Sequence, residues 1–471
     1  MALAGIYVIH LLGLIYTTDI DYALKDLRIK LPLLTLPVIF STGPPVSRKR
    51  IDLVLSVFII AVLVATVVSM LVVTKIINYS VNDIRDISIF ISHIRFSLLI
   101  CLAIFAVIYL VFKYKSTATI ILSATLIIWF GIFLFILESV TGFLVLMSAA
   151  FISLIIYLFK KPFTASTAVA VILLFLLPVS GFLYFKKLYE QATLYPEHEI
   201  NNLKEYTASG NPYEHYTDRR DLENGHIVWI NINWDEMEVA WNQRSSYKFD
   251  SLDKKGQELK VTLVRFLTSK GLNKDKEGVN SLTDDELASV ERGVTNVDDQ
   301  EISNLRSRIS EIFWEYETYK MYGNPGGHSV MQRVEFWKAS LGILKNNSLV
   351  GVGTGDVNNA FVNYYKETDS SLDERWRLRA HNQYLSIAVA FGIIGLTYFL
   401  FAIIYPMSVT KKFNSFLYLS FWITAILSMI SEDTLETQAG VTFFAFFNTF
   451  YLFYLPKDNT NQDTVEPLSP N

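Results

Sequence analysis

The feature that most constrains the fold of this chain is a series of apolar stretches long enough to cross a lipid bilayer. A membrane-spanning helix needs about 20 mostly apolar residues, because the hydrocarbon core offers its backbone no hydrogen-bond partner. We predict such helices at roughly 2–18, 30–42, 51–74, 94–112, 118–137, 141–159, 163–185, 383–405, 413–430 and 439–455. The predicted fold class is therefore an all-α polytopic membrane protein with about ten transmembrane helices.

Composition supports this class and narrows the partners. Of the 471 residues, 51% are hydrophobic and 18% are charged, which is far from the soluble average. The net charge of −4 argues against a nucleic-acid partner. The one cysteine, Cys101, lies in a predicted span, so no intrachain disulfide can form. The lipid bilayer is the first partner that the composition implies.

The basic residues of the short loops predict the orientation. Lys and Arg occur in alternate loops, at Arg48–Arg50, Lys113 with Lys115, Lys160–Lys161 and Lys411–Lys412. Short loops rich in Lys and Arg face the cytoplasm. The other turns are mixed or acidic, including Asp19–Lys30, which we interpret as a loop. We therefore expect both termini in the cytoplasm and the large segment 186–381 outside it.

The pattern divides the chain into five parts. We predict an N-terminal bundle of about seven spans (1–185), an extracytoplasmic insert (186–330), an extracytoplasmic catalytic loop (331–382), a C-terminal bundle of three spans (383–455) and a disordered cytoplasmic tail (456–471). The insert is expected to be mixed α/β or mostly α.

Local patterns in the extracytoplasmic segment predict one strand and several helices. The strand is expected at 226–232, and the helices at 258–270, 283–292, 299–322 and 334–345. Thr283 and Glu286 form a capping-box pattern at the start of the second helix. The last helix has Val334, Trp337, Leu341 and Leu344 at helical spacing. With Phe336 and Ile343 added, its predicted apolar face is wide enough to lie on a membrane surface or on the helix bundle.

His381 is the predicted catalytic residue, in a polar turn that runs into the span at 383–405. An imidazole titrates near neutral pH and can accept a proton from a hydroxyl group. The alternative is a histidine that caps the span and hydrogen-bonds a carbonyl. The neighbouring Arg379 and Asn382 favour the catalytic interpretation.

Arg333, Arg379 and Arg95 are the predicted diphosphate-binding residues. A guanidinium fork matches phosphate oxygens, and a diphosphate leaving group needs its developing charge stabilised. Each has an alternative. Arg333 could pair with Glu335 or Asp356, and Arg95 could extend toward the membrane surface. Arg375 and Arg377 are interpreted as a solvated face.

Other polar residues are predicted to support the site. Glu432 and Asp433, between the last two predicted spans, could orient a histidine, pair with an arginine or form an ordinary polar loop. The loop with Gly351, Gly353, Gly355 and Asp356 lacks the lysine of a P-loop, so we expect a tight turn rather than a phosphate cradle.

No metal site or other cofactor is predicted. The seven histidines are scattered, and no carboxylate cluster has the spacing of metal ligands. Asp19 and Asp21 do form an Asp-x-Asp pattern, but basic residues follow at Lys25, Arg28 and Lys30. We interpret that pattern as charge pairing.

Taken together, these motifs resemble the O-antigen ligase and polymerase superfamily, in its Bacteroidetes type. The resemblance is concentrated at 331–400, where Arg333 precedes Glu335-Phe336-Trp337, followed by the glycine loop, Arg379–Leu385 and Phe391–Leu396. It implies a GT-C-type glycosyltransferase in the bacterial inner membrane, with its large loop in the periplasm. One departure is Val140, because the superfamily often has a second arginine in that place.

The resemblance further implies inverting, metal-independent transfer of a glycan from undecaprenyl diphosphate to an acceptor hydroxyl. His381 matches the superfamily's base and Arg333 its arginine. The acceptor stays open: lipid A core for a ligase in lipopolysaccharide biosynthesis, the growing chain for a polysaccharide polymerase, or a protein for an O-oligosaccharyltransferase. Two other classes are also open, namely a transporter of lipid-linked saccharides and a non-catalytic membrane receptor.

Overall fold

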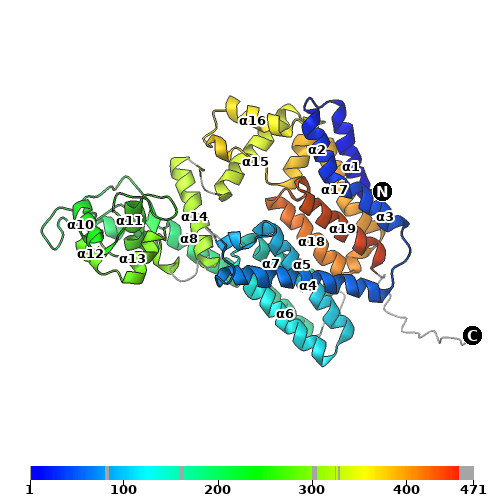
Figure 1. Cartoon of the computed structure of the whole chain (residues 1–471), viewed down its shortest axis with the longest axis horizontal. Coiled ribbons are helices and arrows are strands. Elements are labelled where there is room, and N and C mark those ends of the chain that lie inside the picture. Colours follow the sequence, from blue (N-terminus) through cyan, green and yellow to red (C-terminus); the bar gives the residue numbers. More distant parts are fainter. Residues whose placement is uncertain are drawn as a thin grey trace, which may run out of the picture.

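A computed structural model describes residues 2–79, 84–159, 164–299, 305–323, 325–326 and 329–455 (Figure 1). Within these ranges the chain is mostly helical, and its only sheet pairs β1 (Leu222–Glu223) with β2 (His226–Ile227). The predicted tail 456–471 and the predicted cytoplasmic pair Lys160–Lys161 lie outside the described residues.

Each predicted span coincides with a helix. These are α1 (Ala2–Leu12, extended by η1, Gly13–Ile15), α3 (Pro32–Thr42), α4 (Arg48–Val73), α5 (His93–Tyr114), α6 (Thr117–Ile136), α7 (Val140–Phe159), α8 (Ala165–Thr193), α17 (Gln383–Val409), α18 (Phe416–Ser431) and α19 (Gln438–Tyr454). In the described part of the chain, α4, α5, α6 and α17 are long and apolar enough to cross a membrane. A helical membrane protein is therefore supported, and the count of ten spans stays a prediction.

The segment Asp19–Lys30, interpreted from sequence as a loop, is instead mostly helical. It forms α2 (Ile20–Lys30), and the Asp19 side chain caps it by accepting a hydrogen bond from the Tyr22 backbone N–H. Its buried residues are Ala23, Asp26, Leu27 and Lys30. The interpretation failed because charged residues in sequence suggest solvent, whereas here Asp26 and Lys30 pair with each other inside the protein.

The insert has a core of its own, at the opposite end of the molecule from α1–α3 and α17–α19 (Figure 1). Its helices are α9 (Glu197–Ile200), α10 (Trp234–Arg244), α11 (Leu259–Ser269), α12 (Lys276–Asn280), α13 (Asp284–Glu291) and α14 (Leu305–Tyr322). The predicted helices at 258–270 and 283–292 are confirmed, as is the capping box of Thr283. The strand predicted at 226–232 is wrong beyond Ile227, because Asn231 adopts a left-handed conformation and the chain turns there.

Two helices follow the insert: α15 (Ser329–Asn346) and α16 (Val357–Glu367). The predicted apolar face of α15 is confirmed in part, because Phe336 and Ile343 are buried with Ala339 in the same hydrophobic core as α17. Val334 and Trp337 are half-buried, and Leu341 is exposed. The α15 helix packs against α16 and α17 along that face.

Helix α17 is broken at Gly392, where φ is +64° and ψ is −164°. The loop after α15 fills the break: Ile393 N donates to Ser348 O at 2.9 Å, and Val352 N donates to Val389 O at 3.0 Å. Backbone groups freed by a break in a membrane helix need such partners. A Cβ on Gly392 would lie 2.2 Å from the Leu349 backbone, so glycine is required. The first part of α17 is thereby fixed to the loop that carries the glycine motif.

Candidate functional site

The His381 turn is held at the start of α17 by its neighbours. The Asn382 side chain accepts a hydrogen bond from Leu385 N at 3.0 Å and donates to Ile430 O at 2.9 Å. Trp337 Nε1 donates to Ala380 O at 3.1 Å. Asn382 is therefore the helix cap, and the capping role considered for His381 falls to its neighbour. His381 itself has a φ of +45°, a conformation that costs energy in a non-glycine residue.

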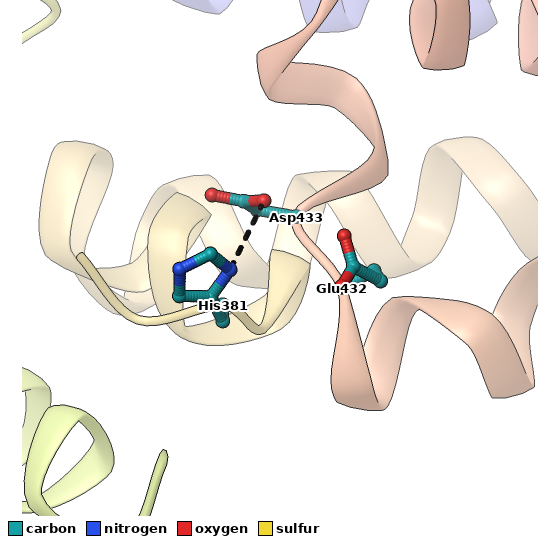
Figure 2. A group of neighbouring side chains, drawn as sticks. All are labelled: His381, Glu432 and Asp433. Atoms are coloured by element: carbon teal, nitrogen blue, oxygen red, sulfur yellow. Dashed lines mark ion pairs between the residues drawn. The ribbon is translucent and has the colours of Figure 1, made fainter. Parts of the chain in front are cut away.

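The His381 ring faces an acidic side chain across a short gap (Figure 2). Its Nδ1 lies 3.9 Å from Asp433 Oδ1, and the side chain is 33% exposed. The ring also lies 5.6 Å from the ring of Phe336. Burial lowers the pKa of His381 below its usual value; Arg333, Arg379 and Arg95 lower it further, while Asp433 raises it. The lowered pKa favours the neutral imidazole, which is the form that can accept a proton.

Two arginines from distant segments meet at Glu432. Figure 2 shows this glutamate next to Asp433, in the group that includes His381. Arg95 starts α5 and Arg333 lies in α15, and each has a terminal nitrogen 3.7 Å from a Glu432 carboxylate oxygen. This distance is longer than a hydrogen bond. Burial and the neighbouring Asp433 raise the pKa of Glu432, against the effect of both arginines. The ion pair of Arg333 with Glu432 differs from the pairs with Glu335 or Asp356 that the sequence suggested.

Arg379 lies in the site but is held differently. Its Nη1 donates to the Tyr22 hydroxyl at 2.9 Å and lies 3.4 Å from Glu436 Oε2. Its Nη2 lies 3.7 Å from Asp433 Oδ2. Arg379 therefore links Asp433 to Glu436 and α2, whereas Arg95 and Arg333 share Glu432.

The other two arginines of this segment lie apart from these carboxylates. Arg377 donates to Leu372 O at 2.9 Å and so closes its own loop. Arg375 is largely exposed and pairs with Asp373 at 3.7 Å. Arg375 agrees with its interpretation as part of a solvated face, whereas Arg377 is half-buried.

The glycine loop and Asp356 hold the connection between α1 and α2. Asp356 accepts hydrogen bonds from Thr18 N, Thr18 Oγ1 and Asp19 N, at 2.7 to 2.9 Å. A Cβ on Gly355 would lie 1.9 Å from Asp19 O, and Gly353 has a φ of +94°. The loop is a tight backbone contact between segments far apart in sequence, which agrees with the predicted tight turn.

Val140, where a second arginine was expected, opens α7 next to α5. Ser139 Oγ donates to Ser97 Oγ at 2.9 Å, and a Cβ on Gly142 would touch the Ser97 side chain. Ser97 is two residues after Arg95 in the first turns of α5. The arginine of α5 therefore comes from the helix that packs against the position of Val140.

His381, Glu432 and Asp433 each place one possible ligand atom within 4.8 Å of the others. The sequence suggested that Glu432 or Asp433 could orient a histidine, but it showed no metal-ligand spacing, because about fifty residues separate the histidine from the acids. Such a set could hold a divalent cation. However, Arg95, Arg333 and Arg379 contact the two carboxylates at 3.7 Å. A cation there would face three permanent positive charges, so the surroundings suit an anion better.

Sequence reasoning missed a second charged group beside this one. Lys30 is fully buried, donates to Glu436 Oε2 at 2.9 Å and also pairs with Asp26. Asp26 in turn lies 3.2 Å from His10 Nδ1 of α1. The available signal was that His10, Asp26 and Lys30 lie in or near the first two predicted spans, where ionisable groups are costly unless paired.

The fold and the site define a helical membrane protein whose charged groups gather where the ends of α5, α15, α17 and α18 meet. Residues 288–400 match the O-antigen ligase family model, which confirms the resemblance to that superfamily. The matched segment contains Arg333, the glycine loop and His381, and ends inside α17. Arg95, Glu432 and Asp433 lie outside it. No curated protein matches the chain.

Proposed function

We propose that this protein is a membrane glycosyltransferase of the O-antigen ligase type. It transfers a glycan from undecaprenyl diphosphate to an acceptor hydroxyl, outside the cytoplasm and without a metal ion. The observation that carries the proposal is the His381 imidazole facing Asp433, beside two carboxylates that three arginines approach, in a chain whose segment 288–400 matches the O-antigen ligase family.

His381 acts as the general base. Its Nδ1 faces Asp433, so its other ring nitrogen is the one assigned to the acceptor hydroxyl. Asp433 orients the ring and stabilises the imidazolium that forms, as the acid does in a nucleophile–histidine–acid triad. The 3.9 Å separation is longer than a hydrogen bond, and such contacts often tighten only when substrate is bound.

Arg333 and Arg95 bind the diphosphate of the donor. They approach one carboxylate from two helices at the same distance, so they can grip an anion from two sides. Arg95 takes the part of the second arginine, because it comes from the helix packed against Val140. Arg379 supports the site by holding Asp433 rather than by binding phosphate.

The transfer step follows from these roles. The acceptor oxygen forms a bond to the anomeric carbon as its proton moves to His381. The bond between that carbon and the phosphate oxygen breaks, and its electron pair leaves with undecaprenyl diphosphate. Arg95 and Arg333 stabilise the negative charge on the leaving group. Attack opposite the leaving group inverts the anomeric configuration.

A test uses the purified full-length protein in phospholipid nanodiscs, with glycan-linked undecaprenyl diphosphate isolated from a strain lacking this protein. We expect His381→Ala to lower kcat about 10²- to 10⁴-fold, the usual contribution of a general base. The matched control is His198→Ala, since His198 is exposed in the insert. Normal transfer by a folded His381→Ala protein would refute the assignment.

The acceptor is tested by offering three classes separately: lipid A core, the lipid-linked glycan itself, and envelope protein. We expect transfer to lipid A core, as for a ligase. Transfer only to the second lipid-linked glycan would make the protein a polymerase, and transfer only to protein would make it an oligosaccharyltransferase. No transfer to any of them by the wild-type protein would favour a transporter or a receptor.

A further inference from the structure

Lys30 is the most deeply buried cation beside the site. Its side chain has no exposed surface, and its Nζ donates to Asp26 and to Glu436 Oε2, the latter at 2.9 Å. Asp26 lies one turn earlier in α2, whereas Glu436 belongs to the short helix η6 (Thr434–Glu436), more than 400 residues away. The lysine therefore joins the N-terminal part of the chain to the segment that follows Asp433.

Glu436 connects this lysine to the proposed catalytic residues. Its second oxygen accepts a hydrogen bond from Gln383 Nε2 at 3.2 Å, and Arg379 Nη1 lies 3.4 Å from Oε2. Gln383 also accepts a hydrogen bond from Leu435 N at 2.6 Å. The η6 turn is thus fixed to the first residue of α17, two residues after His381.

Acidic and basic side chains alternate along a continuous path of contacts between two histidines. From His10 the path runs through Asp26, Lys30, Glu436, Arg379 and Asp433 to His381. Five side chains of the path and the neighbouring Tyr22 line a small pocket; the five are His10, Asp26, Lys30, Arg379 and Glu436. Such a pocket has room for about one water molecule, so it does not admit a sugar or a phosphate.

A buried ion pair is expensive to assemble and gives little stability by itself, whereas removing one partner leaves an uncompensated charge. Lys30 is therefore better explained by what it orients than by what it stabilises. Without Lys30, Glu436 would have Arg379 as its only cation among these contacts. Arg379 would be drawn toward Glu436 and away from Asp433.

We propose that Lys30 is a positioning residue: through Glu436 it fixes Arg379 and the η6 turn, so that Asp433 faces His381. This inference rests on the proposed transferase function. It assigns a role in the reaction to α2, which lies outside the matched family segment. Lys30 contacts neither His381 nor Arg95 nor Arg333, so donor binding should not depend on it.

The first experiment measures kcat and the donor KM of Lys30→Met with the full-length protein in nanodiscs. We expect kcat to fall at least tenfold and KM to change less than twofold, because only the base is misplaced. Lys25→Met is the matched control, since Lys25 is exposed on the same helix. A folded Lys30→Met protein with wild-type kcat, or with an effect confined to KM, would overturn the inference.

A second variant covers the case in which Lys30→Met does not fold. Glu436→Gln keeps the shape of the side chain and leaves the Lys30–Asp26 pair intact. It should show the same fall in kcat at constant KM. Wild-type kcat in a folded Glu436→Gln protein would equally overturn the inference.

Thermal unfolding tests the network without any activity. If Lys30 acts on Arg379 through Glu436, then Lys30→Met and Arg379→Met should shift Tm non-additively, and the non-additivity should vanish in a Glu436→Gln background. Additive shifts would refute the path. A wild-type protein without transfer activity would refute the proposed function alone, and the thermal cycle would still decide the network.

Discussion

Two glutamates four residues apart are equally buried but are held differently, and the contrast distinguishes the carboxylate beside the proposed donor site from the one that is tightly bound within the fold. Glu432 meets Arg95 and Arg333 only at 3.7 Å, and both arginines are about one-fifth exposed. Glu436 is bound by Lys30 at 2.9 Å and by Gln383 at 3.2 Å, and its lysine is fully buried. The first glutamate is loosely held by cations that a ligand can reach, and the second is locked into the fold.

This difference shows how the short segment between α18 and α19 can carry both residues of the proposed reaction and residues that hold the fold together. Loosely paired arginines can exchange their carboxylate for a substrate anion, because the phosphate oxygens offer the guanidinium groups a partner of the same charge. Tight buried pairs cannot, since breaking them leaves a charge without water. Asp433 lies between the two and faces both His381 and Arg379. We therefore infer that the position of the Asp433 carboxylate is set through Arg379 and Glu436, and that this position serves His381.

The largest effect should come from the arginines on the loose side. We expect Arg333→Ala and Arg95→Ala each to lower kcat/KM about 10²- to 10³-fold, the usual loss when one group that stabilises transition-state charge is removed. Each variant should lose less stability to unfolding than Lys30→Met, because each arginine is about one-fifth exposed and Glu432 keeps the other arginine beside it. Lys30→Met should instead cost about 3–5 kcal/mol of stability. Transfer kinetics and thermal unfolding measure both.

The control for the arginines is Arg375→Ala, because Arg375 lies on the exposed turn before the site. Its kinetics should match the wild type. If Arg95→Ala kept full kcat/KM while Arg333→Ala lost it, the donor would be held by a single arginine of the pair, and the comparison between the two glutamates would lose half its basis.

A smaller effect is expected for Asp433→Asn. Asp433 raises the pKa of His381, against burial and the three arginines, so removing its charge should lower that pKa further. A base works while neutral and loses activity as pH falls through its pKa. The acid limb of the kcat profile should therefore move to lower pH, and the plateau should fall about tenfold because the ring is less well oriented. An acid limb shifted to higher pH would contradict this role.

Much of the fold could be predicted, because apolar length and helix signals are local. The segment 94–112 is recognisable from its composition alone, and α5 spans it. The Thr283 cap needed only four residues of sequence. Which part of the wide apolar face of α15 is buried could not be obtained in this way, because Trp337 and Phe336 are both apolar. Contacts with α16 and α17 decided which one is buried.

The same distinction between local and distant signals applies to the candidate site. His381 and Arg333 could be singled out because each lies within a short recognisable motif of adjacent residues. Lys30 could not, since its meaning depends on Glu436, which lies at the other end of the chain. Gly392 illustrates a third case: its glycine was visible, but the break in α17 appears only once the loop at Leu349 lies against it.

A few-fold effect in the opposite direction is expected for Glu432→Gln. The donor diphosphate must replace the Glu432 carboxylate between Arg95 and Arg333, so a neutral side chain of the same shape should lower the donor KM. Burial already raises the pKa of Glu432, so the wild-type donor KM should also decrease as pH falls and the carboxyl takes up a proton. In the variant this pH dependence of KM should disappear. A raised KM would mean that Glu432 helps to hold the arginines in their binding geometry.

The smallest effect is expected from removing divalent metal ions. His381, Glu432 and Asp433 could present ligand atoms to a cation, but three arginines already supply the positive charge near both carboxylates. Incubation with EDTA followed by desalting should therefore leave kcat and the donor KM unchanged. The control adds Mg²⁺ or Mn²⁺ back to the same sample. Activity that is lost with EDTA and restored by either ion would show that the cluster binds a metal. Arg95 and Arg333 would then neutralise a metal ligand, Glu432, rather than bind the diphosphate.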